Sequence, residues 1–197
     1  VLPQLANGVA DKAAEARAGM ARVSSYWDWV PRANPDVFYQ YWCGTAPTHH
    51  LYGLREALDM IVHEEGIETV WARHATLARA VWAAFEAWST DGPIELNMAD
   101  RALRSHAVTS VRIGAPTGTQ LRDWLTQEAG VTLGIGLGMA EPDDPAWHGF
   151  FRVGHMGHLN SHMLLGTLGS IQAGLTALQI PHGSGALDAA AQVCAGG

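Results

Sequence analysis

One arginine interrupts an otherwise apolar run in the second half of the chain. Arg152 lies within Phe150–Gly154, whose composition predicts a β-strand. Because strand side chains alternate, Arg152 shares one face with Phe150 and Gly154, and the residues on either side of it take the other face. An unpaired guanidinium is costly to bury, and its planar fork matches a carboxylate. We therefore expect a carboxylate partner for Arg152, supplied either by one of the 19 acidic residues or by a ligand.

A second group of candidate residues precedes a helical segment in the first half. Gly44 and Thr45 offer backbone N–H groups and a hydroxyl, which can bind an anion such as phosphate near the start of a helix. The simpler alternative is that Thr48 caps the helix without any ligand. Trp42 is the one tryptophan of eight that lies inside this candidate ligand loop.

Histidine is frequent, with ten residues in all and a local set of His155, His158 and His162. A zinc site needs three or four converging ligands and usually a recognisable spacing such as HExxH, which the sequence lacks. We therefore expect no metal site and interpret these histidines as polar caps or surface imidazoles. A metal-binding, histidine-rich domain remains a third interpretation. Neither cysteine lies in a reactive motif and no GxSxG elbow is present, so nucleophilic hydrolysis is not supported.

Composition narrows the class of protein further. The 197 residues, 48% apolar and 16% charged, suit one globular domain or two small ones. A net charge of −7 lacks the basic excess that nucleic acids and anionic membranes attract. The apolar stretches are far shorter than the roughly 20 residues of a membrane span, and no leader pattern is seen. We expect a cytoplasmic protein, and the start at Val1, without Met, suggests a segment of something longer.

Hydrophobic spacing predicts the elements that must hold these residues. Helices are expected at 10–23, 51–66, 67–88, around 121–125, from 161 with Asn160 as the N-cap, and at 186–194. Strands are expected at 108–113, 131–137 and 150–153, with a weaker one at 93–96. Strands that alternate with helices predict an α/β fold in which helices cover a small sheet. The boundary between two parts is expected inside the helix that starts at Ile67.

Several motifs occur in a fixed order along the chain. They are Gly44–Pro47, Leu51–Leu58, Gly66–Glu68 with Trp71–His74, Val108–Val111, Gly136–Gly138 and Phe151–Gly157. In this order they resemble the carboxy-terminal half of class V aminotransferases, a family of fold type I enzymes that depend on pyridoxal phosphate (PLP). The similar types are the alanine–glyoxylate, serine–glyoxylate and pyridoxamine–pyruvate enzymes. The resemblance implies that residues 1–75 end the large cofactor-binding domain with an interface loop, and that 76–197 form the small carboxy-terminal α/β domain.

The resemblance also implies roles for two residues. Arg152 matches the arginine that binds the substrate α-carboxylate, which favours a ligand as its partner. Thr45 matches the threonine that reaches the cofactor phosphate of the neighbouring subunit. The implied protein is a homodimer with shared active sites, which uses pyridoxal 5'-phosphate, or pyridoxal and pyridoxamine, to move an amino group to a small 2-oxo acid.

Two features depart from the family pattern. The Schiff-base lysine has no counterpart, because Lys12 is the one lysine of the chain and lies in an alanine-rich helical context past that position. The catalytic lysine is therefore expected upstream, outside this chain. Trp42 stands where glyoxylate enzymes commonly carry a tyrosine, and without that hydroxyl the loop loses one phosphate ligand.

This loss, and weakly the tail Ile180–Gly183, favour the pyridoxamine–pyruvate type slightly over the alanine or serine–glyoxylate type. The rival from another class is a non-catalytic segment that is inactive without the upstream, lysine-bearing half.

Overall fold

The computed structural model describes residues 11–12, 14–28, 30–33, 38–42 and 44–196. The chain divides into two compact units, Val1–Glu64 (unit 1) and Glu65–Gly197 (unit 2). Cys43 lies outside the described residues, as do the first ten positions.

Unit 1 is helical and has no buried residue among those described. Residues 11–12 and 14–18 are helical, and they are followed by α2 (Val30–Ala33), the short 3-10 helix η1 (Phe38–Tyr41) and α3 (Thr48–Asp59). The helix predicted at 51–66 is α-helical only as far as Asp59. From there the chain continues as the π-helical segment η2 (Met60–Glu65). Thr48 is not the cap, since Pro47 occupies the N-cap position and the Thr48 hydroxyl donates to the carbonyl of Ala46.

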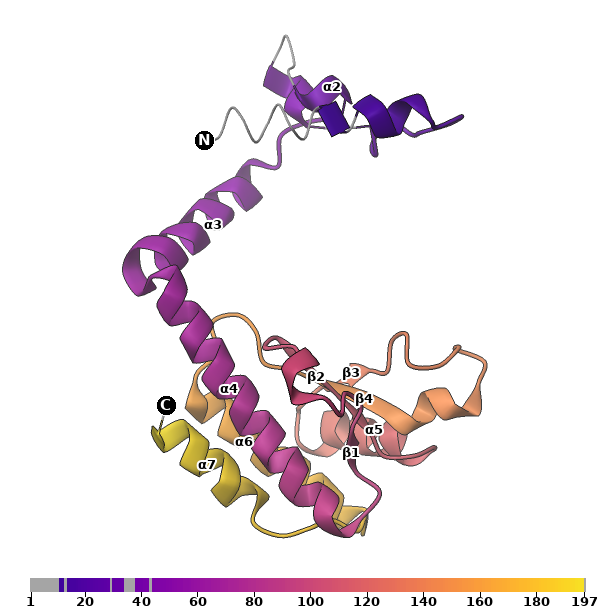
Figure 1. The fold of residues 1–197 in the computed structure, drawn as a ribbon, viewed down its shortest axis with the longest axis vertical. Helices are drawn as coiled ribbons and strands as arrows, with labels where there is room; N and C mark the ends of the chain where they lie inside the picture. The colour runs from indigo at the N-terminus through magenta and orange to yellow at the C-terminus, as the bar shows by residue number, and fades with distance from the viewer. Residues whose placement is uncertain (1–10, 13, 29, 34–37, 43, 197) are drawn as a thin grey trace. The chain divides into compact units, whose positions relative to one another are not determined.

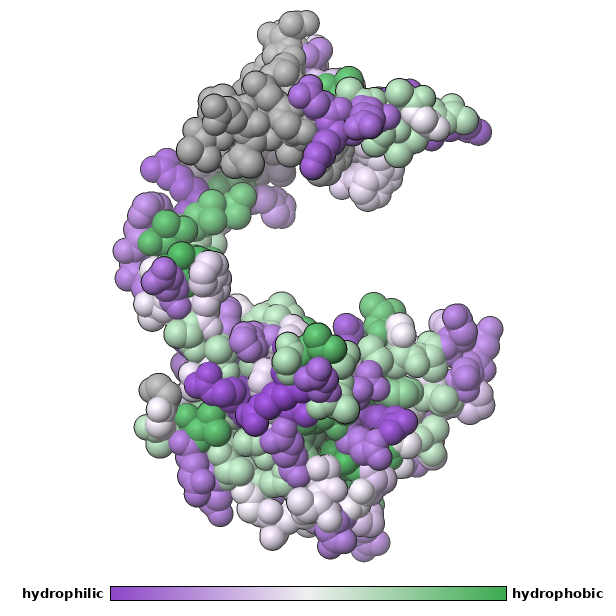
Figure 2. Space-filling view, in the orientation of Figure 1, coloured by the Kyte–Doolittle hydropathy of each residue, from purple (hydrophilic) through white to green (hydrophobic). Residues whose placement is uncertain are grey.

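The apolar face predicted for 51–66 lies open to solvent in the described structure of unit 1. Leu54, Leu58 and Val62 have 55%, 49% and 47% of their surface exposed. Figure 2 shows hydrophobic residues gathered along this helical segment. Spacing alone correctly identified an amphipathic helix, but its apolar side has no cover within the described residues.

Unit 2 contains a four-stranded antiparallel sheet with helices packed against it. Its main helices are α4 (Ile67–Trp88), α5 (Thr117–Glu128), α6 (Ser161–Ala177) and α7 (Ala186–Gly196), and its strands are β1 (Glu95–Leu96), β2 (Val108–Arg112), β3 (Gly134–Ile135) and β4 (Phe150–Gly154). Short 3-10 helices η3 (Ser89–Asp91), η4 (Arg101–Leu103) and η5 (Pro145–Gly149) connect them. The sheet order β1-β2-β4-β3 and its helical cover confirm the α/β fold expected for the small carboxy-terminal domain.

The two faces of the sheet differ in burial. Phe151 and Val153 are buried, and their cross-strand partners Val111 and Thr109 on β2 are buried with them. The intervening residue, Arg152, therefore lies on the opposite face, as strand alternation predicts.

Helices α4, α6 and α7 lie side by side, with the sheet and α5 next to them (Figure 1). The core between these layers contains large side chains from α4, α5, α6 and the central strands, and Ala186 and Ala190 from α7. Its fully buried members include Leu77, Phe85, Trp88, Ile94, Val111, Ile113, Leu121, Leu125, Phe151, Leu164, Leu168, Ile171 and Leu175. At the start of α6, the Asn160 side chain accepts a hydrogen bond from the N–H of Met163 at 3.0 Å, which confirms the predicted N-cap.

The first turns of α4 already belong to unit 2. Val70 is buried, and Arg73 donates hydrogen bonds to the carbonyls of Gly157 and Leu159, at 3.0 and 2.9 Å. The compact units consequently divide between Glu64 and Glu65, earlier than the boundary expected between 75 and 76. The assignment of each part to a domain of a longer enzyme remains a proposal.

The segment Ile180–Gly183 is held by a polar network at the end of α4. The indole N–H of Trp88 donates to Gln172 at 2.7 Å, and the amide nitrogen of Gln172 lies 2.6 Å from Nε2 of His182. A Cβ at position 183 would lie 2.2 Å from the carbonyl oxygen of Ala87, so glycine is required there. This segment therefore has a structural role in unit 2, which the sequence did not suggest.

Candidate functional site

Arg152 is held by the edge strand β3 in a defined direction. Its Nε donates to the carbonyl of Ile135 at 2.7 Å, and its residue pairs with Gly134 in the β3–β4 register. A Cβ at position 134 would lie 3.3 Å from Cβ and 3.5 Å from Nε of Arg152. The absence of a side chain at Gly134 thus leaves room for the arginine beside β3.

The two terminal nitrogens of Arg152 are left for another partner. Among the described residues, no carboxylate forms an ion pair with Arg152, and its one hydrogen bond uses Nε. Since the fork of Nη1 and Nη2 is the part that matches a carboxylate, the geometry suits bidentate binding of a ligand. The carboxylate-binding role of Arg152 remains a prediction.

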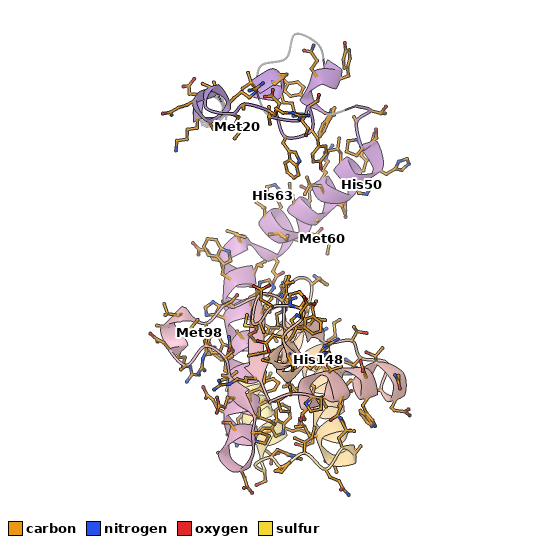
Figure 3. All side chains as sticks on the ribbon, turned by 90° about the vertical axis from the view of Figure 1, so that its right-hand side faces the viewer. Met20, His50, Met60, His63, Met98 and His148 are labelled. Carbon is orange, nitrogen blue, oxygen red and sulfur yellow. The ribbon has the colours of Figure 1, made fainter. Side chains whose placement is uncertain are left out.

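A small hollow lies beside strand β2 of unit 2. Ser110, the partner of Arg152 in the β2–β4 register, lines a cavity of about 190 Å³ together with Asn97, Met98 and Met139. Figure 3 labels Met98 in this part of the unit. The hydroxyl oxygen of Ser110 is buried without a hydrogen-bond partner in the structure. The hollow thus has an unused hydroxyl and mostly apolar walls, and Arg152 is not among the residues that line it.

The buried face of the same strand carries a polar chain of four groups. His155, which follows β4, is fully buried, and its Nδ1 lies 3.1 Å from the carbonyl oxygen of His106. Its Nε2 lies 2.9 Å from the hydroxyl of Thr109, which accepts a hydrogen bond from the indole N–H of Trp82 at 3.1 Å. Burial lowers the pKa of the His155 imidazole below its ordinary value, which favours the neutral ring. The sequence prediction of a cap or surface imidazole is therefore wrong for His155.

The turn that follows β4 is tied to the start of α4. Arg73, which bonds two carbonyls of this turn, also donates to Glu65 with Nε and Nη2, at 2.6 and 2.9 Å. His74 adds a contact of 2.9 Å to the carbonyl of Gly157, whose φ of +86° favours glycine. The hydrogen-bonded guanidinium lowers the pKa of the Glu65 carboxyl. These contacts fix the backbone shortly after Arg152.

The candidate anion loop of unit 1 presents its threonine to solvent. Thr45 is exposed, and Gly44 before it has a φ of +133° with open space where a Cβ would lie. Trp42 and Gly44 line a hollow of about 350 Å³, to which Asp28, Arg32 and Tyr39 also contribute. The indole nitrogen of Trp42 is buried and has no hydrogen-bond partner in the structure. The loop therefore offers one exposed hydroxyl and one unused N–H donor.

The remaining candidates do not form a site in the described part of the chain. Among those residues, no three His, Cys, Asp or Glu side chains are placed to hold a metal ion. Figure 3 shows His50 and His63 at separate points along the helical segment of unit 1, and His148 in unit 2 contacts Thr119 instead. Lys12 is exposed on a helical turn. None of the described helices is both long and apolar enough to cross a bilayer.

Sequence reasoning found Arg152 but missed the residues that direct it. Gly134, Ile135 and Ser110 come from strands whose pairing with β4 cannot be deduced from local patterns. For His155 a usable pattern was present, because it continues the alternation of Phe151 and Val153 and so belongs on the buried face.

Known proteins are similar to most of this chain in sequence and fold. In an alignment 182 residues long that covers 88% of the chain, it is 33% identical to a serine–glyoxylate aminotransferase of Methylorubrum extorquens, 42% of which is matched. A solved ureidoglycine–glyoxylate aminotransferase of Bacillus subtilis is 27% identical and superimposes with a TM-score of 0.70 over 90% of the chain and 44% of its own. No protein-family model matches the sequence.

A second solved structure supports the fold. A pyridoxamine–pyruvate aminotransferase of Mesorhizobium loti superimposes with a TM-score of 0.73 over 93% of the chain and 45% of its own, at 23% identity. The chain thus spans less than half the length of the curated and solved proteins that it matches.

Proposed function

Because this chain is homologous to the carboxy-terminal part of class V aminotransferases, we propose that it is part of a vitamin-B6-dependent enzyme that moves an amino group to a small 2-oxo acid. In this enzyme the chain supplies the carboxylate-binding arginine and the interface loop. The lysine that the reaction needs comes from outside the chain, since exposed Lys12 has no site around it in the described residues.

The observation that carries the proposal is the unpaired fork of Arg152. Its Nε is used by the carbonyl of Ile135, which leaves Nη1 and Nη2 side by side for the two oxygens of a carboxylate. A substrate held in this way has its reacting carbon in a fixed direction, and such positioning contributes to the rate.

The interface loop fits the phosphate end of a B6 group. An exposed threonine hydroxyl after a glycine in an unusual conformation can donate to a phosphate oxygen, and Trp42 lies three residues earlier in the same loop. When bound, the B6 group carries the amino group and acts as the electron sink, while the protein supplies binding and orientation. Thr45 and Trp42 are accordingly the proposed cofactor-binding residues of this chain.

The proposed enzyme is a homodimer in which Thr45 serves the active site of the neighbouring subunit. The open apolar face of α3, with Leu54 and Leu58 about half exposed, supports a further polypeptide surface over unit 1. The upstream half of the same enzyme and the second subunit are the two proposed partners. A cytoplasmic location remains a prediction.

Two oxo acids remain as acceptors. The two proteins with higher sequence identity to this chain are glyoxylate aminotransferases. The pyridoxamine–pyruvate aminotransferase shares the fold at 23% identity. The tail Ile180–Gly183, which by resemblance weakly favours the pyruvate type, also has a structural role in the network around Trp88. Trp42 in place of a tyrosine is the feature that still supports the pyridoxamine–pyruvate reaction.

A steady-state assay of the complete protein tests the proposal. After bound cofactor is removed, one reaction receives pyridoxamine and pyruvate, and a second receives pyridoxal phosphate, serine or alanine, and glyoxylate. Pyridoxal formed in the first reaction supports the pyruvate type, and hydroxypyruvate or pyruvate formed in the second supports the glyoxylate type. No amino transfer in either reaction would overturn the proposal and favour a non-catalytic segment.

A further inference from the structure

The geometry points to His155 as a positioning residue for Arg152: its buried neutral ring locks the pairing of β4 with β2, so that the guanidinium fork faces the substrate carboxylate. This inference rests on the proposed function, because it concerns the same carboxylate. His155 itself lies on the other face of the sheet and touches no substrate.

The hydrogen bonds fix one tautomer of the ring. A carbonyl can only accept, so Nδ1, which lies 3.1 Å from the carbonyl of His106, must carry the proton. Nε2 then carries no proton and accepts a hydrogen bond from the hydroxyl of Thr109, 2.9 Å away. The Thr109 oxygen in turn accepts from the indole N–H of Trp82. Every donor in this network of hydrogen bonds has one acceptor, so none of its buried donors is left without a partner.

The network joins three elements to the end of β4. Trp82 belongs to α4, Thr109 to β2, and the His106 carbonyl to the segment that leads into β2. The backbone N–H of His155 also donates to the carbonyl of Ala107 at 2.9 Å. Side chain and backbone of one residue therefore hold the last position of the β2–β4 pairing.

This network specifies a register that apolar alternation cannot specify. A slip of one residue would move Arg152 into the core, which the cost of burying its charge already prevents. A slip of two residues would keep Phe151 and Val153 on the buried face, so alternation does not exclude it. That slip would separate His155 from Thr109 and leave a buried ring nitrogen and an indole N–H without partners, at a cost typical of unsatisfied buried groups.

The register decides what surrounds the guanidinium. In the observed pairing, Arg152 lies opposite Ser110 on one side and Gly134 on the other. Gly134 is the neighbour that leaves room for the side chain, and the adjacent Ile135 carbonyl fixes Nε. If β4 slipped against β2, Ser110 would no longer lie opposite Arg152, and Gly134 and Ile135 would stay beside Arg152 only if β3 slipped together with β4.

The test is a set of variants of the complete protein, assayed for the oxo acid. For His155→Leu, which removes both hydrogen bonds, we expect KM to rise about tenfold with kcat per active site nearly unchanged, because the carboxylate is bound less well in ground and transition state alike. Thr109→Val removes the hydroxyl at the centre of the hydrogen-bond network, while valine keeps nearly the same side-chain shape. This variant should also raise KM. His155→Gln, whose carbonyl can accept from Thr109, should recover part of the loss.

His182→Leu is the matched control. His182 also bonds a carbonyl with Nδ1 and a side chain with Nε2, at 2.6 Å each, but it lies in the network of Trp88 and Gln172. It should lower stability and leave KM unchanged. A ¹⁵N spectrum of the full chain should also show His155 with Nδ1 protonated and Nε2 bare, a signal that is lost in His155→Leu.

The double variant separates the positioning role from the proposed function. If His155 acts through Arg152, adding His155→Leu to Arg152→Lys should raise KM little beyond Arg152→Lys alone. If Arg152→Lys raises KM but His155→Leu and Thr109→Val reduce only the number of active sites, the positioning role is overturned. If Arg152→Lys itself leaves KM unchanged, the proposed function fails as well.

Discussion

The two units of the chain differ in how they bury their residues. In unit 2 more than twenty hydrophobic residues are buried, among them Phe85, Trp88 and Phe151, and the polar groups inside are bonded to one another through His155 and Thr109. In unit 1 no described residue is buried, and Leu54 and Leu58 on α3 are about half exposed. Unit 2 therefore has an extensive hydrophobic core, whereas the described residues of unit 1 form none.

The comparison also separates the two kinds of functional residue. Arg152 is directed by strands of its own unit, through the Ile135 carbonyl and the space at Gly134. Thr45 lies on an exposed loop, where no described neighbour fixes its hydroxyl. The proposed carboxylate-binding residue is thus positioned by its own unit, whereas the proposed phosphate-binding residue is not positioned by any described neighbour.

Removing a large side chain from each unit gives the largest expected contrast. Phe85→Ala in unit 2 should lower the free energy of unfolding by about 3–5 kcal/mol, because the ring is fully buried against Trp88 and Phe151. Leu58→Ala on the open face of α3 should cost less than about 1 kcal/mol in this chain alone. Urea unfolding followed by tryptophan fluorescence measures both. Equal losses would show that unit 1 has a core of its own.

A smaller effect is expected at the interface loop. Thr45→Ala should weaken pyridoxal phosphate binding by about 1 kcal/mol in the complete protein, since one hydroxyl donor to the phosphate is lost. Unphosphorylated pyridoxal has no phosphate for this hydroxyl, so its affinity should stay the same and serves as the control. Titration of cofactor absorbance gives both dissociation constants, and an equal loss for the two forms would contradict phosphate binding by Thr45.

The smallest effect concerns the pH dependence of stability in unit 2. Burial holds the pKa of His155 below its ordinary value of 6.5, so the unfolded chain takes up more protons than the folded one just below that pH. Stability from the neutral ring is therefore complete above pH 6.5 and is lost as the pH falls further. Unfolding free energies measured between pH 5 and 8 should show this slope, which should flatten in His155→Leu. His74 and His106 lie near His155 and are the same in both proteins.

Glu65 provides an internal reference in a different pH range. The bonded Arg73 lowers the pKa of the Glu65 carboxyl below its ordinary value of 4.5, so the contribution of this pair is present above that value and is lost as the pH falls below it. A slope between pH 5 and 6.5 therefore belongs to histidine and not to this ion pair. No slope there in the original chain would contradict the neutral buried state of His155.

Local patterns predicted the helices better than the sheet. The helix at 67–88 and the Asn160 cap were predicted as observed, because spacing and capping are local properties. The strand expected at 131–137 shrinks to Gly134–Ile135, since this segment also contains Gly136 and glycine weakens a strand. Strand order, which brings Ser110 and Gly134 to Arg152, depends on contacts distant in sequence.

The candidate site shows the same division. The sequence identified Arg152 from its charge in an apolar strand, but could not decide between an acidic residue and a ligand as its partner. Only the folded arrangement brings Ile135 to Nε and leaves both Nη atoms without a carboxylate among the described residues. The capping alternative for Thr48 failed because Pro47, with no N–H to lose, occupies the N-cap position.

The most direct measurement of the central claim compares a 2-oxo acid with its amide in the complete protein, with and without Arg152→Lys. Arginine should favour the acid, because its two terminal nitrogens bind both carboxylate oxygens. Lysine is a single point charge, so Arg152→Lys should lose about 2 kcal/mol of this preference, which lowers kcat/KM for the acid roughly thirtyfold. The amide, which lacks the second anionic oxygen, should lose far less. An equal loss for acid and amide, or no loss for either, would contradict carboxylate binding by Arg152.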